Sequence, residues 1–190
     1  CPSVEPEYRS NERRVGMLYR RPTLNCECGS KVLEMLYCDQ CGDVSIGGYI
    51  MNDDHDDHTF LGNTPDVFPT PQESYISKRK HSEWRWFWPK PLQGDPNASK
   101  LTNRTVNGKK SGGRFVPAAI NPHIGRLYNL GGPDVDGSSD IKVTSLSYQI
   151  SPSGPGYDLP GLPEACPNCM VVPPGKQQKD FTNASVRTPI

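Results

Sequence analysis

The chain has 190 residues, in which 21 Lys and Arg residues balance 21 Asp and Glu residues, so its formal net charge is zero. This length allows one domain, or a small module with long arms. The balanced charge gives no global reason to expect a nucleic acid or a membrane as partner, so any such binding must come from a local patch. Leu, Ile, Val and Phe make up just under a fifth of the residues, a composition poor in apolar surface for a chain that must fold.

The 18 glycines and 20 prolines exceed ordinary usage and predict short strands, many turns and little helix. We therefore expect a mainly β fold of zinc-ribbon-like hairpins with long irregular loops. No apolar run is long enough to cross a bilayer, and the start does not resemble a signal peptide. We expect a cytoplasmic protein. Because the chain starts on Cys1 without a methionine, we also expect it to be one module, residues 1–190, of a longer protein.

The cysteines carry the most specific signal. Cys26 and Cys28 form a CxC pair, Cys38 and Cys41 form a CxxC pair, and a glycine directly follows Cys28 and Cys41. A thiolate pair on a tight turn supplies two corners of a tetrahedron, and glycine can take the positive φ that lets the backbone turn back. We predict one zinc site from these four thiols, on a three-stranded zinc ribbon over residues 13–51 with strands at 13–20, 32–37 and 44–50. Gly47 and Gly48 predict a bulge or a close approach in the third strand. Two disulfides or free thiols are the alternative.

A second CxxC pair, Cys166-Pro-Asn-Cys169, is a potential zinc knuckle, meaning a tight turn that carries two thiol ligands, and it needs further ligands. Cys1 can supply one, and the simplest prediction is a second four-Cys site whose missing ligand precedes Cys1. The alternative is that Cys166 and Cys169 share in one mixed site. Residues 166–190 would then be this knuckle and a tail.

Residues 52–82 are predicted to be an acidic and Pro-rich loop followed by a basic one. His55 and His58 lie among four aspartates, but nothing in the sequence preorganises them, so we interpret this stretch as a solvated loop and give little weight to a zinc hydrolase. Residues 83–165 are predicted to hold short strands and loops.

Trp84, Trp86 and Trp88 alternate in one strand, which favours a buried face in a chain short of aliphatic residues. The competing interpretation is a nucleic-acid surface on which bases stack. The candidate contact residues are Lys78, Arg79, Lys80 and Arg85.

Residues 90–113 have no period and predict a locally basic surface loop, in which the glycine pattern of a nucleotide-binding loop is incomplete. Residues 115–120 and 125–130 predict a hairpin. Residues 141–150 are the longest strand-like run and predict a strand with a bulge or an exchange of face between Val143 and Leu146.

Several stretches, taken in order, resemble large bacterial superfamily 2 DEAD/DEAH-box helicases with a C-terminal MZB zinc-binding domain, among them anti-phage defence helicases of the DISARM and Druantia kinds. They are residues 28–49, the run Trp84-Arg-Trp-Phe-Trp-Pro89, Phe115-Val-Pro-Ala118, residues 162–169 around the CPxC knuckle, and Thr188-Pro-Ile190.

The resemblance implies a parent protein that is an ATP-dependent DNA helicase or translocase, with ATP and Mg²⁺ bound outside residues 1–190, because this chain has no phosphate-binding GKT or GKS motif and no DEAD-type box. For this segment it implies a zinc-binding accessory module without catalytic residues, which braces the motor and contributes part of the DNA path. A module that docks other defence proteins through the tryptophan face and the 90–113 loop is the alternative.

Overall fold

In the part of the chain that the structure describes, short extended runs separated by turns fold into one sheet of nine strands. We describe the protein from a computed structural model, which places residues 4–8, 15–21, 23–55, 58–64, 79–92, 100–106, 109–129, 140–149, 159–163, 165–170 and 186–187. Besides a 3-10 turn η1 (Pro6–Tyr8), these contain β1 (Glu34–Cys38), β2 (Val44–His55), β3 (His58–Gly62), β4 (Trp84–Trp88), β5 (Lys100–Val106), β6 (Lys109–Asn121), β7 (Arg126–Asn129), β8 (Ile141–Gln149) and β9 (Val186–Arg187). Within these ranges no helix has the length and apolar character needed to cross a membrane. The predicted mainly β class with little helix is confirmed.

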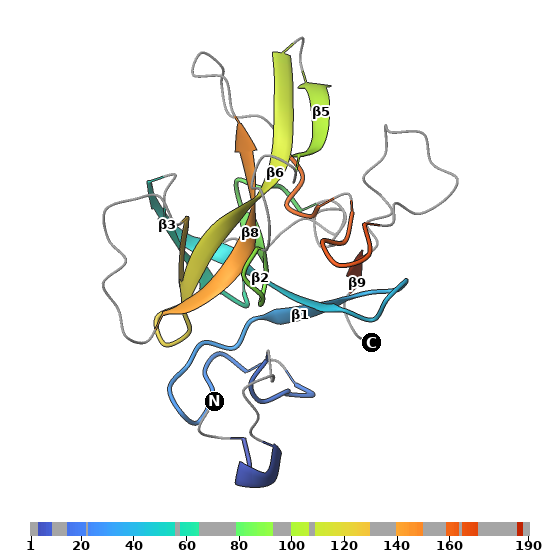
Figure 1. Cartoon of the computed structure of the whole chain (residues 1–190). Helices are drawn as coiled ribbons and strands as arrows, with labels where there is room; N and C mark the ends of the chain where they lie inside the picture. Colours follow the sequence, from blue (N-terminus) through green and yellow to red (C-terminus); the bar gives the residue numbers. More distant parts are fainter. Residues whose placement is uncertain are drawn as a thin grey trace.

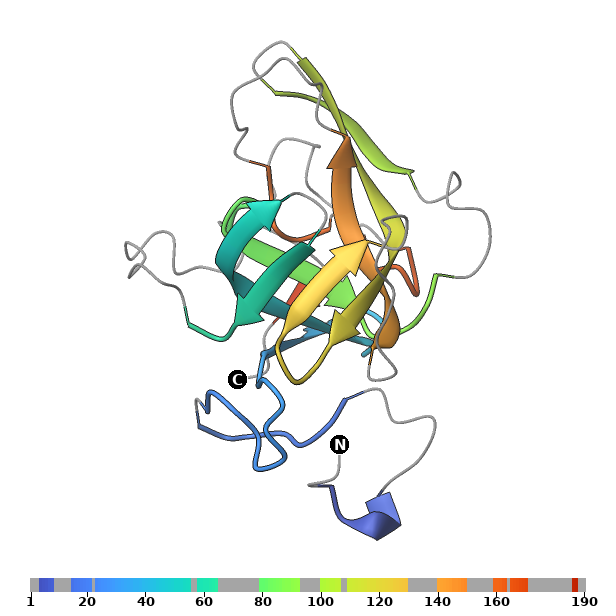
Figure 2. The same ribbon diagram turned by 90° about the vertical axis from the view of Figure 1, so that its left-hand side faces the viewer.

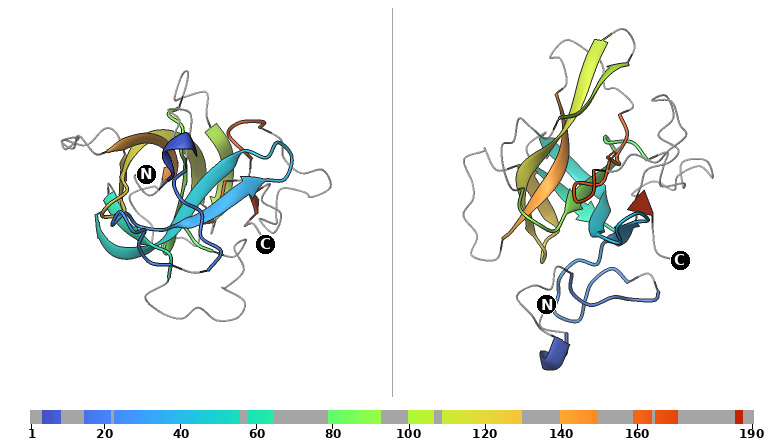
Figure 3. Two further views of the ribbon diagram at one scale, coloured as in Figure 1. Left: turned by 90° about the horizontal axis from the view of Figure 1, so that it is seen from below. Right: turned by 45° about the vertical axis from the view of Figure 1, so that its right-hand side comes forward.

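Six antiparallel strands close into a barrel, in the order β2-β3-β7-β6-β8-β4 and back to β2 (Figures 1 and 2). Closure is possible because β2 is long: its first half pairs with β4 through Ile46–Tyr49, and its second half pairs with β3 from Tyr49 onward. Seen from below, the strands run around a ring (Figure 3, left). β1 pairs with the start of β2 and extends the sheet outside the barrel, where β9 joins it.

The barrel interior is filled by apolar side chains from all six strands. The fully enclosed cluster consists of Leu61, Phe87, Ala118, Ile120, Leu127 and Val143, with Leu33, Ile46 and Ile50 packed against it. Successive residues of a strand face opposite sides of the sheet, so the other face of the same strands needs a separate cover.

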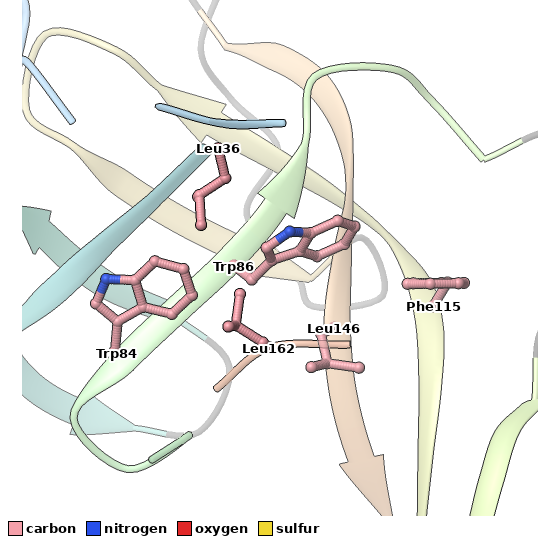
Figure 4. Packing of buried hydrophobic residues seen from close by; sticks show 6 residues of the cluster. All are labelled: Leu36, Trp84, Trp86, Phe115, Leu146 and Leu162. Carbon is pink, nitrogen blue, oxygen red and sulfur yellow. The ribbon is translucent and has the colours of Figure 1, made fainter. Parts of the chain in front are cut away.

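A second cluster covers part of the outer face of the barrel. It is built from Leu36, Trp84, Trp86, Phe115, Leu146 and Leu162, and Figure 4 shows the two indole rings and the leucines gathered around β4. Trp84 and Trp86 have no exposed surface and Trp88 is half-buried, so the predicted buried tryptophan face is confirmed for the first two residues. Leu162 belongs to the segment 159–163, which lies over this face.

Backbone contacts hold that segment in place. The His81 N–H donates to the carbonyl of Leu159, the Gly161 N–H donates to the carbonyl of Arg79, and the Tyr148 hydroxyl donates to the carbonyl of Pro160. These hydrogen bonds hold the segment so that the Leu162 side chain packs in the same cluster as Trp84 and Trp86. The segment is therefore an integral layer of the fold, although it lies in a Pro- and Gly-rich stretch predicted to be loop.

Gly47 is required by the approach of Trp84. A Cβ atom at residue 47 would lie 1.8 Å from the indole ring, so no other residue fits without a shift. This confirms the close approach predicted at the Gly47-Gly48 pair.

Several strand predictions are confirmed. β6 and β7 form the predicted hairpin, and β8 is the strand predicted at 141–150. In β8, Val143 packs in the barrel interior and Leu146 packs in the outer cluster. The pairing of β6 with β8 is continuous through these residues, so of the two predicted alternatives the exchange of face is observed and the bulge is not.

Other predictions are wrong. Residues 15–20 form no strand, and residues 13 and 14 lie outside the described part, so a three-stranded ribbon over 13–51 is not observed. The expected boundary after residue 51 falls inside β2, and residues 58–62 form β3. Residues 100–106 and 109–113, predicted to be surface loop, belong to β5 and β6. Polar strands of this kind lack the alternating apolar pattern on which the strand predictions relied.

Candidate metal centre

The first half of the centre is the turn that joins β1 and β2. Cys38 is the last residue of β1, and the Gly42 N–H closes the turn by donating to the Cys38 carbonyl at 2.8 Å. Gly42 has a φ of 72°, in the left-handed region where a glycine avoids steric cost. This turn brings the thiols of Cys38 and Cys41 to the end of the β1–β2 hairpin, as the sequence predicted.

The second half repeats this geometry more than 120 residues later. The Met170 N–H donates to the Cys166 carbonyl at 2.8 Å, and Met170 has a φ of 53°. Met170 thus occupies the position that Gly42 holds in the first turn. Figure 1 shows this segment beside the end of the β1–β2 hairpin.

The four thiols converge. The Sγ atoms of Cys38, Cys41, Cys166 and Cys169 all lie within 4.8 Å of one another. The Cys38–Cys169 and Cys41–Cys166 sulfur pairs are each separated by 3.8 Å. A tetrahedral zinc with Zn–S bonds of about 2.3 Å places its sulfurs about 3.8 Å apart, whereas a disulfide bond is about 2.05 Å long. The four cysteines are free thiols, and their arrangement could hold a metal ion.

Burial around the cluster is uneven. Cys38 and Cys166 are buried, Cys169 is half-buried and Cys41 is exposed. Burial raises the pKa of the Cys38 thiol and, more strongly, that of the Cys166 thiol. For Cys41 burial is again the largest influence and opposes ionisation. Hydrogen bonds from Asn168, the Asp43 backbone and the thiols of Cys169 and Cys38 outweigh it, however, and lower the pKa of Cys41 to about 7.

These protonation preferences fit a cation site. Four neighbouring thiolates repel one another, and burial raises the pKa of two of the thiols, Cys38 and Cys166. A divalent cation at the centre would supply the positive charge that stabilises the deprotonated ligands. The Asn168 amide also lies 3.6 Å from Cys41 Sγ and is placed to orient this exposed ligand.

Asp43 connects the centre to the barrel. Its carbonyl accepts from the Cys38 N–H at 2.9 Å, while its carboxylate accepts from the Trp88 indole at 2.9 Å and from Lys90 Nζ at 3.0 Å. Lys90 Nζ also lies 4.8 Å from the centre of the Trp88 ring. The first knuckle is therefore fastened to β4 by a residue that is not itself one of the four thiols.

The predicted grouping of cysteines is wrong in one respect. Cys38 and Cys41 were predicted to join Cys26 and Cys28, but the structure joins them to Cys166 and Cys169. This corresponds to the alternative in which Cys166 and Cys169 share a site with other thiols. The two turns that meet have the same CxxC spacing, and the pair left over has the shorter CxC spacing. This difference in spacing is the feature of the sequence that could have indicated which thiols share a site.

Cys26 and Cys28 lie on a separate tight turn. The Gly29 N–H donates to the Cys26 carbonyl, the Tyr19 hydroxyl donates to Cys26 Sγ at 3.2 Å, and the Cys28 thiol donates to Ser30 Oγ at 3.3 Å. Cys1, predicted to complete a second site, lies outside the described residues.

The residues predicted to contact nucleic acid have varied surroundings. Lys78 lies outside the described part of the chain. Arg79 pairs with Glu34 and stacks over the rings of Tyr49 and Trp84, with 9% of its side chain exposed. Lys80 forms a backbone bridge with Pro160, and Arg85 lies near His81, whose pKa is lowered well below its usual value, chiefly by burial and also by the Arg85 charge. Arg79 thus has a structural role in holding β1 against β4.

The fold and the cysteine cluster together define a class of protein: an antiparallel β-barrel whose outer layer is fastened at a potential metal centre. The model of the YjiV N-terminal domain family matches residues 18–186, and the protein belongs to this family. The match includes all four clustered cysteines. No curated protein and no solved structure matches the chain.

Proposed function

We propose that this chain is a zinc-binding accessory module of an ATP-dependent DNA helicase or translocase, in a bacterial anti-phage defence system. It braces the motor domains and contributes part of the path of the DNA. The observation that carries the proposal is the convergence of four thiols at sulfur separations suited to zinc. The helicase context rests on the resemblance of residues 28–49, 84–89, 115–118 and 162–169 to such proteins.

Zinc is favoured by the donor set. Four sulfur ligands in a tetrahedron select zinc or an iron–sulfur centre over Mg²⁺ and Ca²⁺, which take oxygen ligands. Paired CxxC turns followed by a left-handed residue are the arrangement of structural zinc sites. All four positions are supplied by protein, so no position remains for a reactive water, and a structural role follows.

A structural role also agrees with where the centre lies. It joins the β1–β2 hairpin to the segment that contains Leu162 and covers Trp84 and Trp86. A bound zinc would fasten this cover onto the barrel. The module would then present a rigid surface to its parent protein.

One surface feature supports bracing. A cavity of about 640 Å³ opens between the N-terminal segment and the end of the barrel, and its lining includes Met17, Leu18, Phe87 and Ile141. Met17, Leu18 and Ile141 are also exposed. Leu24 is exposed too, as is Ile124, whose neighbours His123 and Gly125 line the cavity. Exposed apolar residues around a hollow are suited to packing against another domain, and here the occupant would be the remainder of the parent helicase.

The same feature favours the second candidate, a docking module that contacts no DNA. The tryptophan face cannot serve it, because Trp84 and Trp86 are fully buried. Docking would instead use the apolar end of the barrel.

Native mass spectrometry tests the metal. We expect one zinc ion per chain, lost when Cys38 and Cys41 are both replaced by Ser and retained when Cys26 and Cys28 are both replaced by Ser. A chain that carries no metal, or that loses it equally in both variants, contradicts the proposed centre.

Binding of the chain to single-stranded DNA at increasing salt separates the two candidates. Affinity that falls steeply with salt supports a DNA path, because phosphate contacts release counterions. Absence of binding at all salt concentrations favours docking. In the parent protein, we expect DNA-stimulated ATP hydrolysis, and its absence would contradict the helicase context.

A further inference from the structure

The hairpin of β5 and β6 projects from the barrel, and β8 flanks its base at residues 112–114. β5 pairs with the first part of β6, from Lys100 opposite Arg114 to Val106 opposite Lys109. β7 pairs with β6 only at residues 118–121, and β8 reaches no further than Gly112. The hairpin therefore extends beyond the other barrel strands, as Figures 1 and 2 show. We call residues 100–106 and 109–114 the arm.

The arm has a one-sided charge. It contains Lys100, Arg104, Lys109, Lys110 and Arg114, and the sequence has no Asp or Glu between Asp95 and Asp134. In a chain with zero net charge, such an uninterrupted basic stretch is a local feature. Acidic residues are concentrated elsewhere, for example in the four aspartates at 53–57.

The clustered positive charge destabilises the arm when no partner is bound. The backbone register sets two of its cations, Lys100 and Arg114, directly opposite each other, whereas Lys109 and Lys110 lie opposite Val106 and Thr105 and are neighbours only along β6. Like charges directly across a strand pair are destabilising. Cations on an edge strand also discourage pairing with other sheets. Five cations without a carboxylate point to an anionic partner.

The intervening residues favour phosphate as that anion. Between residues 100 and 114 most of the others are Thr, Asn, Ser or Gly, which donate hydrogen bonds or permit close backbone approach. Beyond Gly112 the arm is a two-stranded antiparallel ribbon, whose width enters the major groove of DNA. Its positive charge also suits the backbone of a single strand.

We propose that the arm is the surface through which this module binds the phosphate backbone of DNA. The inference rests on the proposed function, and it places the DNA contact on residues 100–114 instead of on residues 78–85. The partly buried ion pair of Arg79 with Glu34 supports this change, because that guanidinium is already engaged within the fold.

The test compares two variants with the same loss of charge. In the arm variant, Lys100, Arg104, Lys109 and Lys110 are each replaced by Gln. In the control variant, Arg20, Arg21, Lys31 and Lys142, all exposed residues outside the arm, are replaced by Gln. Affinity for a 30-nucleotide single strand and for the corresponding duplex is measured on the whole chain at several salt concentrations.

We expect the wild-type chain to bind with a strong salt dependence. Each lost phosphate contact lowers the slope of log affinity against log salt by about 0.9 for a duplex and about 0.7 for a single strand. For the arm variant, the slope of log affinity against log salt should therefore be smaller by about three. For the control variant, the slope should stay close to that of the wild-type chain. A variant with only Lys109→Gln and Lys110→Gln should show about half of this decrease in slope. This two-residue variant replaces the four-residue variant if the latter folds poorly.

The inference is overturned if the wild-type chain does not bind DNA at low salt, or if the arm and control variants weaken binding equally. Zinc content, measured on the same samples, tests the proposed function separately. A chain that holds zinc and binds DNA without using the arm contradicts only this inference.

Discussion

The barrel interior and the outer tryptophan cluster are two apolar cores that share the same strands but are enclosed differently. The interior is surrounded by six hydrogen-bonded strands, so its side chains are covered by the closed sheet itself. The outer cluster lies on the convex face and is covered by residues 159–163, held by a few backbone hydrogen bonds and by their proximity to Cys166. A closed sheet needs no further support, whereas a short covering segment loses much chain entropy for little contact area and benefits from a covalent or metal constraint.

The largest effect should come from removing the metal constraint. Replacing Cys166 and Cys169 by Ser should destabilise the protein by several kcal/mol, because structural zinc supplies about 10–16 kcal/mol of apparent binding energy in small zinc-finger peptides. Hydrogen exchange should accelerate first at β1 and residues 159–163 and only later at β3, β6 and β7. Cys28→Ser is the control. Equal acceleration in both regions would show that the two cores unfold as one unit.

Two leucine-to-alanine substitutions, one in each core, test whether the outer cluster and the barrel interior affect zinc binding differently. Leu162→Ala in the outer cluster and Leu127→Ala in the barrel should each cost about 2–5 kcal/mol, since both side chains are almost fully buried. Only Leu162→Ala should also weaken zinc binding, because it loosens the segment that leads to Cys166. Urea denaturation and chelator competition measure the two quantities. A matching loss of zinc affinity in Leu127→Ala would contradict the separation of the cores.

Gly47→Ala tests the contact between β2 and the outer cluster. The new methyl group would overlap the Trp84 ring, and overpacking of this kind costs about 1–3 kcal/mol. Tryptophan fluorescence during denaturation reports both the stability and the displaced indole. Unchanged stability and an unchanged spectrum would mean that Trp84 does not approach β2 as described.

The outer cluster should also be more sensitive to acid. Burial, followed by the Arg85 charge, lowers the pKa of His81 well below its usual value of 6.5, so the imidazole is neutral in the folded protein. Below about pH 6.5 the unfolded chain takes up a proton that the folded chain does not, and stability falls as pH decreases. The slope contributed by one such group is at most about 1.4 kcal/mol per pH unit.

Comparing the wild type with His81→Phe isolates this contribution. The variant keeps an aromatic ring against Tyr148, which lies 4.9 Å from His81 between ring centres. We expect the variant to show a shallower loss of stability between pH 6.5 and 5, measured by urea titration at each pH. Parallel curves would assign the acid sensitivity to other groups.

The smallest effect concerns the second knuckle. Met170 has a left-handed backbone and an exposed side chain, so Met170→Gly removes steric cost without removing buried contacts. We expect a net stabilisation of about 0.5–1 kcal/mol, since the greater freedom of glycine in the unfolded chain offsets part of the gain. Thermal unfolding of the zinc-loaded protein measures it, and a destabilised variant would show that the methionine side chain makes needed contacts.

Much of the local structure could be predicted from residue patterns. The alternation of Trp84, Trp86 and Trp88 predicts a strand with a buried face, and Gly47 is predicted at a close approach. The CxxC pairs predict tight turns because spacing and a left-handed residue act over only a few residues. The arm escaped prediction, since its strands are polar and have no apolar alternation, and they form because β6 continues out of the barrel.

Residue patterns alone were therefore enough to predict the β class, the tryptophan strand and the sulfur ligands of each CxxC turn. Which of the cysteine turns meet depends on the folded arrangement of the strands. Thiol pairs are chemically interchangeable in a sequence, and Cys41 and Cys166 are 125 residues apart. They come together because the barrel brings the β1–β2 hairpin and the segment after residue 159 to the same side of β4, an outcome of long-range strand pairing that no local pattern encodes.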